Sequence, residues 1–322
     1  AGFSSYSIWW LLCHYEWYRY HGNKAYLEQS RDYITALLRQ LMTQIAPDGQ
    51  ECLDGTRFLD WPSNSNKDAI AAGLQALMVW GMRVGVEFAE LFEDRQLSND
   101  CKAAEKKLVK AASKVYKKFL ASCPAPDAPG SKQVTALMTI TGLIDAPKAD
   151  KEFLSINGAQ GFSTFYGYYM LEAMAMAGNY QGALDVIREY WGAMIDLGAT
   201  SFWEDFDINW IPNAAPIDEL VPEGKKDIHG DCGAYCYVGF RHSLCHGWAS
   251  GPTSWLSRHI LGVEVIEPGC RQVRITPHLG DLQWVKGTFP TPYGELQIYH
   301  EKQANGNVIS EVKAPKGVSV IK

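Results

Sequence analysis

Apolar residues recur at helical spacing over most of the first 260 residues, and the pattern changes afterwards. Residues 4–20 are predicted to form an aromatic-rich helix that ends at His21-Gly22. Asn23 is expected to cap a second helix that runs to about Ile45 and carries an apolar stripe. Further helical segments are predicted over 66–93, 98–121, 132–143, 150–155, 163–196 and 247–262.

From Val263 onward, apolar and polar residues alternate, as they do along strands. The pair Asn305-Gly306 lies between two alternating segments and is a strong signal for a β-hairpin. We therefore predict a mainly α chain with two domains. Residues 1–262 would form a helical domain, and residues 263–322 a small antiparallel β-sandwich.

Helical hairpins repeat weakly along the helical part. An aromatic-rich helix precedes, and an amphipathic helix follows, both Gly22-Asn23 and Gly178-Asn179. Hairpins of this kind, stacked in a ring, form an α/α toroid. A closed toroid of six hairpins has twelve helices, whereas roughly eight or nine are predicted here. We therefore expect an (α/α)6 toroid that is incomplete at its N-terminal end.

Composition narrows the possible partners. The chain has 322 residues, of which 47% are hydrophobic and 20% charged, so it can bury a substantial core. The net charge of −6 argues against nucleic acid as a partner. The early apolar run from Ile8 to Leu12 is far shorter than the ~20 residues of a membrane span. No signal peptide is visible, and the chain begins at Ala1 within a helical pattern, so we expect a piece of a longer protein. The compartment is unknown, with periplasm or secretion favoured over cytoplasm.

The eight cysteines do not form the pattern of a disulfide scaffold. Cys101 and Cys123 bracket one predicted helix and are too far apart to bond. The spacing of Cys232, Cys236 and Cys245 matches no common zinc site, so we predict no metal and no cofactor. Buried thiols, or one local Cys232–Cys236 bridge, are expected instead.

The strongest candidate chemistry lies in residues 198–210, GATSFWEDFDINW, where Glu204, Asp205 and Asp207 stand among aromatic residues. Carboxylates beside aromatic rings lose solvation, which favours their protonated form and suits them to proton transfer. The flat faces of the rings can also stack on a sugar. This combination is typical of a glycoside-cleaving site. The simpler alternative is a surface loop whose acids face water and whose rings face the core.

Two further segments carry candidate site residues. His246 and Trp248 stand at the start of the predicted helix 247–262, where a histidine is suited to hydrogen bonding. A histidine that merely fills its loop is the simpler alternative. The turn-rich segment 46–66 is a long loop, and such loops are often functional. Its candidate residues are Asp54, Asp60 and Trp61.

These segments resemble a known family. GATSFWEDF, SLCHGWASGP and the tail that begins GVEVIEPGCRQVRITPHLG closely resemble the C-terminal half of bacterial α-L-rhamnosidases, glycoside hydrolase family 78. SIWWLLCHYEWYRYHGN, FLDW and GFSTFYGYYMLEAMAMAGN are similar to earlier blocks of the same catalytic domain. The resemblance implies an (α/α)6 barrel followed by a β-sandwich. It also implies inverting hydrolysis of terminal α-L-rhamnosides, with a rhamnose-containing glycoside or polysaccharide as the partner.

The resemblance also assigns roles to residues. Glu204 matches the general base, which activates water across the sugar ring from a carboxylic acid ~6.5–9.5 Å away. The family's acid motif lies upstream of the SIWW-like helix, so we expect the acid outside this chain and a weak or inactive fragment. The implied substrate-binding residues are His246, Trp61, Trp9, Trp10, Asp60, Trp203 and Trp248.

Other functions remain open at this point. Another exo-glycosidase with an α/α toroid would fit, whereas a polysaccharide lyase is disfavoured because the site block is acidic. A non-catalytic sugar-binding protein could use the same tryptophans and would not need Glu204. A purely structural helical protein would leave the aromatic and acidic clusters unexplained. If hairpins are missing, exposed apolar helix faces would favour self-association.

Overall fold

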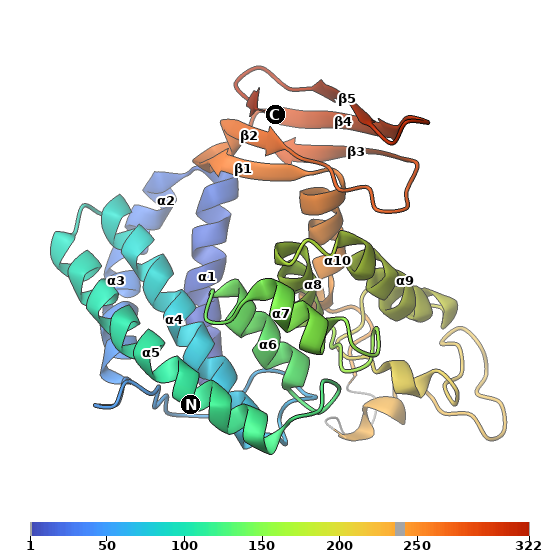
Figure 1. Cartoon of the computed structure of the whole chain (residues 1–322), viewed down its shortest axis with the longest axis horizontal. Helices are drawn as coiled ribbons and strands as arrows, with labels where there is room; N and C mark the ends of the chain where they lie inside the picture. The colour runs from blue at the N-terminus through green and yellow to red at the C-terminus, as the bar shows by residue number, and fades with distance from the viewer. Residues whose placement is uncertain (1, 236–241, 322) are drawn as a thin grey trace. The chain divides into compact units, whose positions relative to one another are not determined.

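A computed structural model describes residues 2–235 and 242–321, which divide into two compact units (Figure 1). The chain passes between the units several times, so each unit combines segments that are distant in sequence. Unit 1 comprises Ala1–Phe58, Leu74–Lys117 and Leu256–Lys322, and unit 2 comprises Leu59–Gly73 and Lys118–Trp255. The predicted domain boundary at residue 262 stays a prediction.

The first 260 residues are helical, as predicted, and two details differ. The predicted helix 23–45 is divided at Ser30, which ends one helix and begins the next. The predicted helix 247–262 is irregular: it comprises the 3₁₀ turn Gly247–Ala249, the short α-helix Gly251–Trp255 and the π-helical segment Leu256–Ile260. The helices are α1 (Ser4–His21), α2 (Lys24–Gln29), α3 (Arg31–Thr43), α4 (Lys67–Leu91), α5 (Arg95–Ser122), α6 (Ser131–Ile140), α7 (Ala146–Ala149), α8 (Gly167–Met176), α9 (Tyr180–Asp196) and α10 (Gly251–Trp255).

Helix α4 packs closely against its neighbours in unit 1 through glycine. A Cβ atom at Gly85 would lie 2.7 Å from the Cδ2 of Leu38 in α3 and 2.8 Å from the Sγ of Cys101 in α5. A glycine at position 85 therefore lets α4 approach both neighbouring helices closely. By length and composition α4 could cross a membrane, but 78% of its most apolar window is buried, which is typical of a core helix.

Helix α6 is the buried helix of unit 2, because every residue from Ser131 to Thr139 is shielded from solvent. Lys132 reaches out of this helix to donate hydrogen bonds to the carbonyl oxygens of Ile156 and Gly158, at 2.8 and 2.7 Å. Burial lowers the pKa of Lys132 to about 8. The lysine thus joins α6 to a turn of the same unit.

The strands form two three-stranded sheets with the orders β1-β2-β6 and β3-β4-β5. The hairpin predicted at Asn305-Gly306 is confirmed between β4 and β5, where Gly306 adopts a φ of +85°. Strand β6 pairs with β2 in parallel, which corrects the expectation of purely antiparallel pairing. The strands are β1 (Val263–Glu267), β2 (Gln272–Ile275), β3 (Trp284–Thr291), β4 (Gly294–Lys302), β5 (Val308–Lys313) and β6 (Ser319–Ile321).

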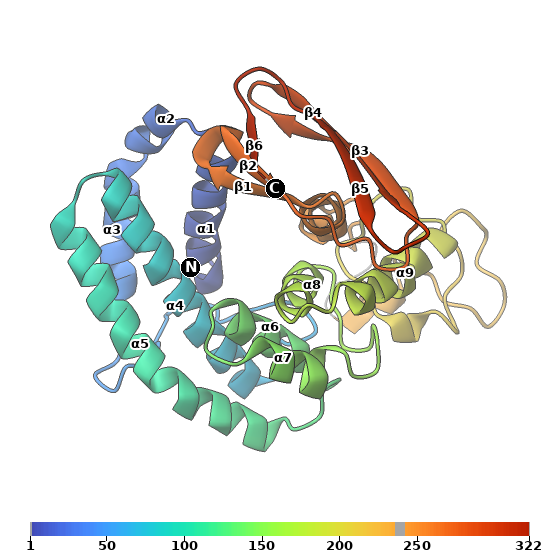
Figure 2. The same cartoon turned by 45° about the horizontal axis from the view of Figure 1, so that its top comes forward.

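The two sheets lie next to each other and contribute to one apolar core (Figure 2). Val273 of the first sheet and Leu296 of the second are both completely buried in it. His300 is also fully buried and bridges Leu261 and Ser310 through its two ring nitrogens. Along β3, β4 and β5 the inward residues alternate with outward ones, which leaves one face of this sheet open to solvent.

Candidate functional site

The acidic segment and the histidine segment lie side by side in unit 2. The backbone N–H of Glu204 donates to the carbonyl oxygen of Ser243 at 2.8 Å. The N–H of His246 donates to the carbonyl oxygen of Phe202 at 2.7 Å. These two bonds hold together segments that are about 40 residues apart, so Glu204 and His246 occupy one site.

Side chains alternate in direction along residues 203–205. Trp203 and Asp205 are buried, at 0% and 2% exposure, whereas the Glu204 side chain between them keeps 13%. The carboxylate of Glu204 therefore reaches solvent, whereas the side chains on either side of it do not. This corrects the prediction for Trp203, which packs edge-on against Phe206 in the core and presents no face to a sugar.

Glu204 is fixed from several directions, while one of its carboxylate oxygens stays available. Its carbonyl oxygen accepts hydrogen bonds from Thr164 Oγ1 at 2.6 Å and from Trp248 Nε1 at 2.5 Å. Its Oε2 accepts from the backbone N–H of Ser243 at 3.2 Å and lies 3.8 Å from Nδ1 of His246. Within the described part of the chain, no hydrogen bond reaches Oε1. A carboxylate held in this way can take a proton from a water molecule.

An aromatic surface adjoins Glu204. Trp248 stacks on Phe165 with ring centres 5.1 Å apart and an interplanar angle of 3°. The ring of His246 packs against Trp248, and the two ring centres are 4.7 Å apart. All three rings are partly exposed. They offer flat apolar faces beside a carboxylate, which is what a sugar ring requires.

Asp60 is the centre of a buried hydrogen-bond cluster. It is 1% exposed, and both of its oxygens accept hydrogen bonds. One oxygen accepts from the backbone N–H of Ser63 at 3.0 Å and from its hydroxyl at 2.5 Å. The other accepts from Gln133 Nε2 at 3.1 Å and from Ser163 Oγ at 2.6 Å. These bonds join the loop after Phe58 to helix α6 and to the segment before α8.

Two consecutive residues connect this hydrogen-bond cluster to Glu204. Ser163 donates to Asp60, and the next residue, Thr164, donates to the carbonyl oxygen of Glu204. The prediction that Asp60 contacts the sugar is therefore corrected, because its oxygens are buried and engaged. Asp60 is therefore connected to the backbone of Glu204 through Ser163 and Thr164.

Three further tryptophans were predicted to bind the sugar, and each is described within its own unit. Trp61 follows Asp60 in unit 2 and is half-buried. Trp9 and Trp10 belong to unit 1, where Trp9 packs edge-on against Trp80 and is 7% exposed. Trp10 is half-buried, with its ring 3.7 Å from that of His14. A role in sugar binding for Trp61, Trp9 and Trp10 stays a prediction.

Sequence reasoning did not select Thr164, Phe165 or Ser243, although each contacts a site residue. The first two lie in the segment GFSTFYGYYM, which is rich in aromatic residues. Its aromatic residues supply a signal for Phe165. Nothing in the sequence indicates that the hydroxyl of Thr164 or the amide of Ser243 would hold Glu204.

His242 supports the site from within the core of unit 2. It is 1% exposed, and its Nε2 accepts a hydrogen bond from the backbone N–H of Asp205 at 3.1 Å. Nδ1 lies 3.2 Å from the carbonyl oxygen of Ile228, so the proton of the neutral ring belongs on Nδ1. Burial lowers the pKa of His242 below its ordinary value. A protonated ring could no longer accept from Asp205.

We expect His242 to make unit 2 sensitive to acid. The native pKa is lowered, so the unfolded chain binds a proton near pH 6.5 while the native histidine stays neutral. Stability is therefore lost as the pH falls from about 6.5 toward the native pKa, at up to ~1.4 kcal/mol per pH unit. Urea unfolding followed by tryptophan fluorescence should show a larger loss between pH 7.5 and 5.5 for the native protein than for His242→Gln. Equal losses in both proteins would contradict this role.

The described residues contain neither a cluster of metal ligands nor a disulfide bond. Residues 2–235 and 242–321 contain no group of three potential metal ligands. Cys232 and Cys245 are free thiols, and Cys245 is exposed beside the site. Cys236, the other half of the predicted local bridge, lies outside the described residues.

Comparison with known proteins identifies the family that this chain resembles. Residues 262–321 match the family described as the bacterial α-L-rhamnosidase C-terminal domain. The fold of 99% of the chain is shared with a GH78 rhamnosidase of Bacillus sp. GL1, with a TM-score of 0.76 and 21% identity. The resemblance to bacterial α-L-rhamnosidases is thereby confirmed.

Other solved structures have the same fold. An α-L-rhamnosidase of Streptomyces avermitilis, complexed with L-rhamnose, matches 94% of the chain with a TM-score of 0.66 and 18% identity. An α-L-rhamnosidase of Dictyoglumus thermophilum matches 94% with a TM-score of 0.70 and 18% identity. The chain spans 33%, 28% and 33% of these three structures, in the order given. No curated protein matches the chain.

Proposed function

Because the chain has the fold of GH78 rhamnosidases and carries their C-terminal domain, we propose that it is part of an enzyme that hydrolyses terminal α-L-rhamnosides. The helical part would belong to an (α/α)6 toroid, and the two sheets would form a β-sandwich domain. The observation that carries the proposal is the available Oε1 of Glu204 beside the stack of Trp248 on Phe165.

In this proposal Glu204 is the general base. Its Oε1 removes a proton from a water molecule while the water oxygen attacks the anomeric carbon and the bond to the leaving oxygen breaks. The attack occurs on the face opposite the leaving group, which inverts the configuration. Three hydrogen bonds support this role: those from Thr164 and Trp248 fix the backbone carbonyl of Glu204, and that from Ser243 restricts its carboxylate.

The leaving oxygen needs a proton from a second group. Asp60 and Asp205 are buried at 1% and 2% exposure, which makes them unsuited to protonate a substrate. Asp207 caps the turn Ile208–Trp210 through the N–H of Asn209. The family resemblance implies an acid motif upstream of the SIWW-like helix, and on that ground we propose that the acid comes from outside these 322 residues. General acid–base catalysis typically contributes ~10²–10⁴-fold, so residues 1–322 alone should be weakly active or inactive.

The sugar would lie against the rings beside Glu204. Trp248 and Phe165 would support the apolar face of the rhamnose ring, and His246 would hydrogen-bond its hydroxyls or the attacking water. A sugar-binding role for Trp61, Trp9 and Trp10 is proposed from the family resemblance alone. Rhamnose carries a methyl group where hexoses carry a hydroxymethyl group, and an apolar wall gains about 1–3 kcal/mol from such a difference.

Proton NMR of p-nitrophenyl α-L-rhamnoside hydrolysis tests the proposal. The 322-residue chain and the longest product of its gene are compared under the same conditions. We expect hydrolysis by the longer product, with the β anomer of rhamnose appearing first. The α anomer first would exclude inversion, and equal rates would place the acid within residues 1–322. No hydrolysis by either protein would favour a non-catalytic sugar-binding protein.

A further inference from the structure

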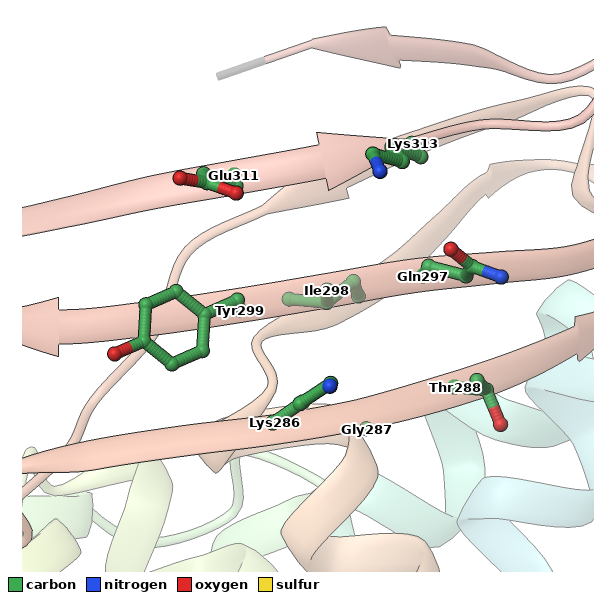
Figure 3. Close-up of a pocket in the computed structure, with 8 residues that line it drawn as sticks. All are labelled: Lys286, Gly287, Thr288, Gln297, Ile298, Tyr299, Glu311 and Lys313. Carbon is green, nitrogen blue, oxygen red and sulfur yellow. The ribbon is translucent and has the colours of Figure 1, made fainter.

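The outward face of the sheet β3-β4-β5 forms an open groove of about 720 Å³ (Figure 3). Its volume lies within the range of ligand pockets in proteins. The groove belongs entirely to unit 1 and is lined by residues of three adjacent strands. The proposed rhamnosidase mechanism does not use this groove.

Two aromatic rings stand on this face. Trp284 of β3 pairs with Glu301 of β4, and two positions along, Lys286 pairs with Tyr299. Residues two apart share a face of a strand, so Trp284 and Tyr299 are diagonal neighbours on the outward side, with Cα atoms ~7–8 Å apart. Trp284 is 60% exposed, although tryptophan is highly buried on average.

The orientation of Tyr299 is fixed by a neighbour. Its hydroxyl donates to the carboxylate of Glu301 at 2.9 Å. This bond raises the pKa of Tyr299 and keeps its hydroxyl protonated. The ring therefore lies along β4, as Figure 3 shows, with one face turned outward. A ring positioned in advance loses less conformational entropy when a ligand stacks on it.

Polar side chains surround the ring of Tyr299. They project on the same side of the sheet in Figure 3 and supply amide, hydroxyl, ammonium and carboxylate groups. Register places Gln297 between Thr288 and Lys313, and Tyr299 between Lys286 and Glu311. Three carboxylates on the same face, those of Glu295, Glu301 and Glu311, offset the two lysines. This balance favours a neutral ligand that is rich in hydroxyl groups over an anion or a cation.

From these observations we propose that the outward face of β3-β4-β5 is a second carbohydrate-binding surface. Its ligand is a neutral oligosaccharide segment of the rhamnose-containing glycan, stacked on Trp284 and Tyr299 and hydrogen-bonded by Gln297 and Lys286. The proposal rests on the proposed function for the identity of the glycan. Binding here would hold a polymer near the enzyme without chemical change to it.

Affinity electrophoresis of the 322-residue chain in gels that contain a soluble polymer of α-linked L-rhamnose tests this surface. We expect the polymer to retard the native chain, and the double variant W284A/Y299A to bind at least about tenfold more weakly, because two stacking contacts are lost. Tyr299→Phe keeps the ring and should bind within about threefold of the native chain. Circular dichroism and thermal unfolding confirm that each variant is folded.

A matched control tests whether retardation is specific to this surface, and a catalytic variant tests whether it depends on hydrolysis. Tyr26→Ala removes a tyrosine that is 39% exposed from helix α2 and should leave retardation unchanged. Glu204→Gln should also leave it unchanged, even where it abolishes hydrolysis. Native retardation that persists in W284A/Y299A, or a native chain that the polymer does not retard, would overturn the proposal. Loss of hydrolysis alone would bear on the proposed function and not on this surface.

Discussion

Glu204→Gln is expected to abolish turnover of p-nitrophenyl α-L-rhamnoside while leaving sugar binding measurable. The amide keeps the size of the side chain and can still accept the N–H of Ser243 through its oxygen. It cannot take a proton from water, so kcat should fall by ~10²–10⁴-fold or more. The experiment compares kcat for the longest active product of the gene with that of its variant.

A binding measurement completes this test. The dissociation constant of L-rhamnose, measured by calorimetry, should change much less than kcat because the rings of Trp248 and Phe165 remain in place. Ser201→Ala, beside the site on the same segment, provides a control whose kcat should stay close to that of the native enzyme. Unchanged turnover in Glu204→Gln would remove Glu204 from the role of base.

Asp60→Ala is expected to destabilise unit 2 by about 3–5 kcal/mol, because it leaves several buried donors without an acceptor. The affected donors are the N–H and hydroxyl of Ser63, the amide of Gln133 and the hydroxyl of Ser163. The free energy of unfolding in urea, followed by tryptophan fluorescence, measures the loss. Activity should fall as well, because the segment that holds Glu204 loses its anchor.

The matched control is Asp196→Ala, which removes an exposed carboxylate from the last turn of helix α9. An acid at this end opposes the helix dipole, so its removal should change stability by less than about 1 kcal/mol. A similarly small effect for Asp60→Ala would mean that the buried cluster contributes little to the stability of unit 2.

Much of the secondary structure could be predicted from the sequence because it is encoded locally. Asn23 and Asn179 each cap the helix that follows, by accepting the N–H of Tyr26 and of Gly182. The hairpin at Asn305-Gly306 likewise follows from the two residues of its turn. In each case the deciding interaction lies within three or four residues, where a sequence pattern is informative.

The pairing of β6 with β2 could not be predicted in the same way. Ser319 pairs with Gln272 across more than 40 residues, and parallel pairing leaves no turn signal in the sequence. The burial of Trp203 was hidden for a similar reason. Which ring of the acidic segment faces the core depends on the direction of the backbone, and that direction is set by bonds to the distant Ser243.

The residues of the candidate site with recognisable chemical groups could be selected from the sequence. The residues that hold them in position could not. Glu204, His246 and Trp248 could be selected because carboxylate, imidazole and indole groups carry recognisable functions. Thr164 and Ser243 hold Glu204 through a hydroxyl and a backbone amide, which occur throughout any chain. Asp60 looked like a sugar ligand because a carboxylate beside a tryptophan suits both exposed and buried roles.

The bonds from Ser163 to Asp60 and from Thr164 to Glu204 have a consequence for screens of random variants. Inactivating substitutions should not be confined to residues that touch the substrate. A second group should appear around Asp60, Ser63 and Gln133, and compensating changes should arise within that same group. Libraries intended to alter specificity should therefore keep these three residues unchanged and vary Trp248 and Phe165 instead.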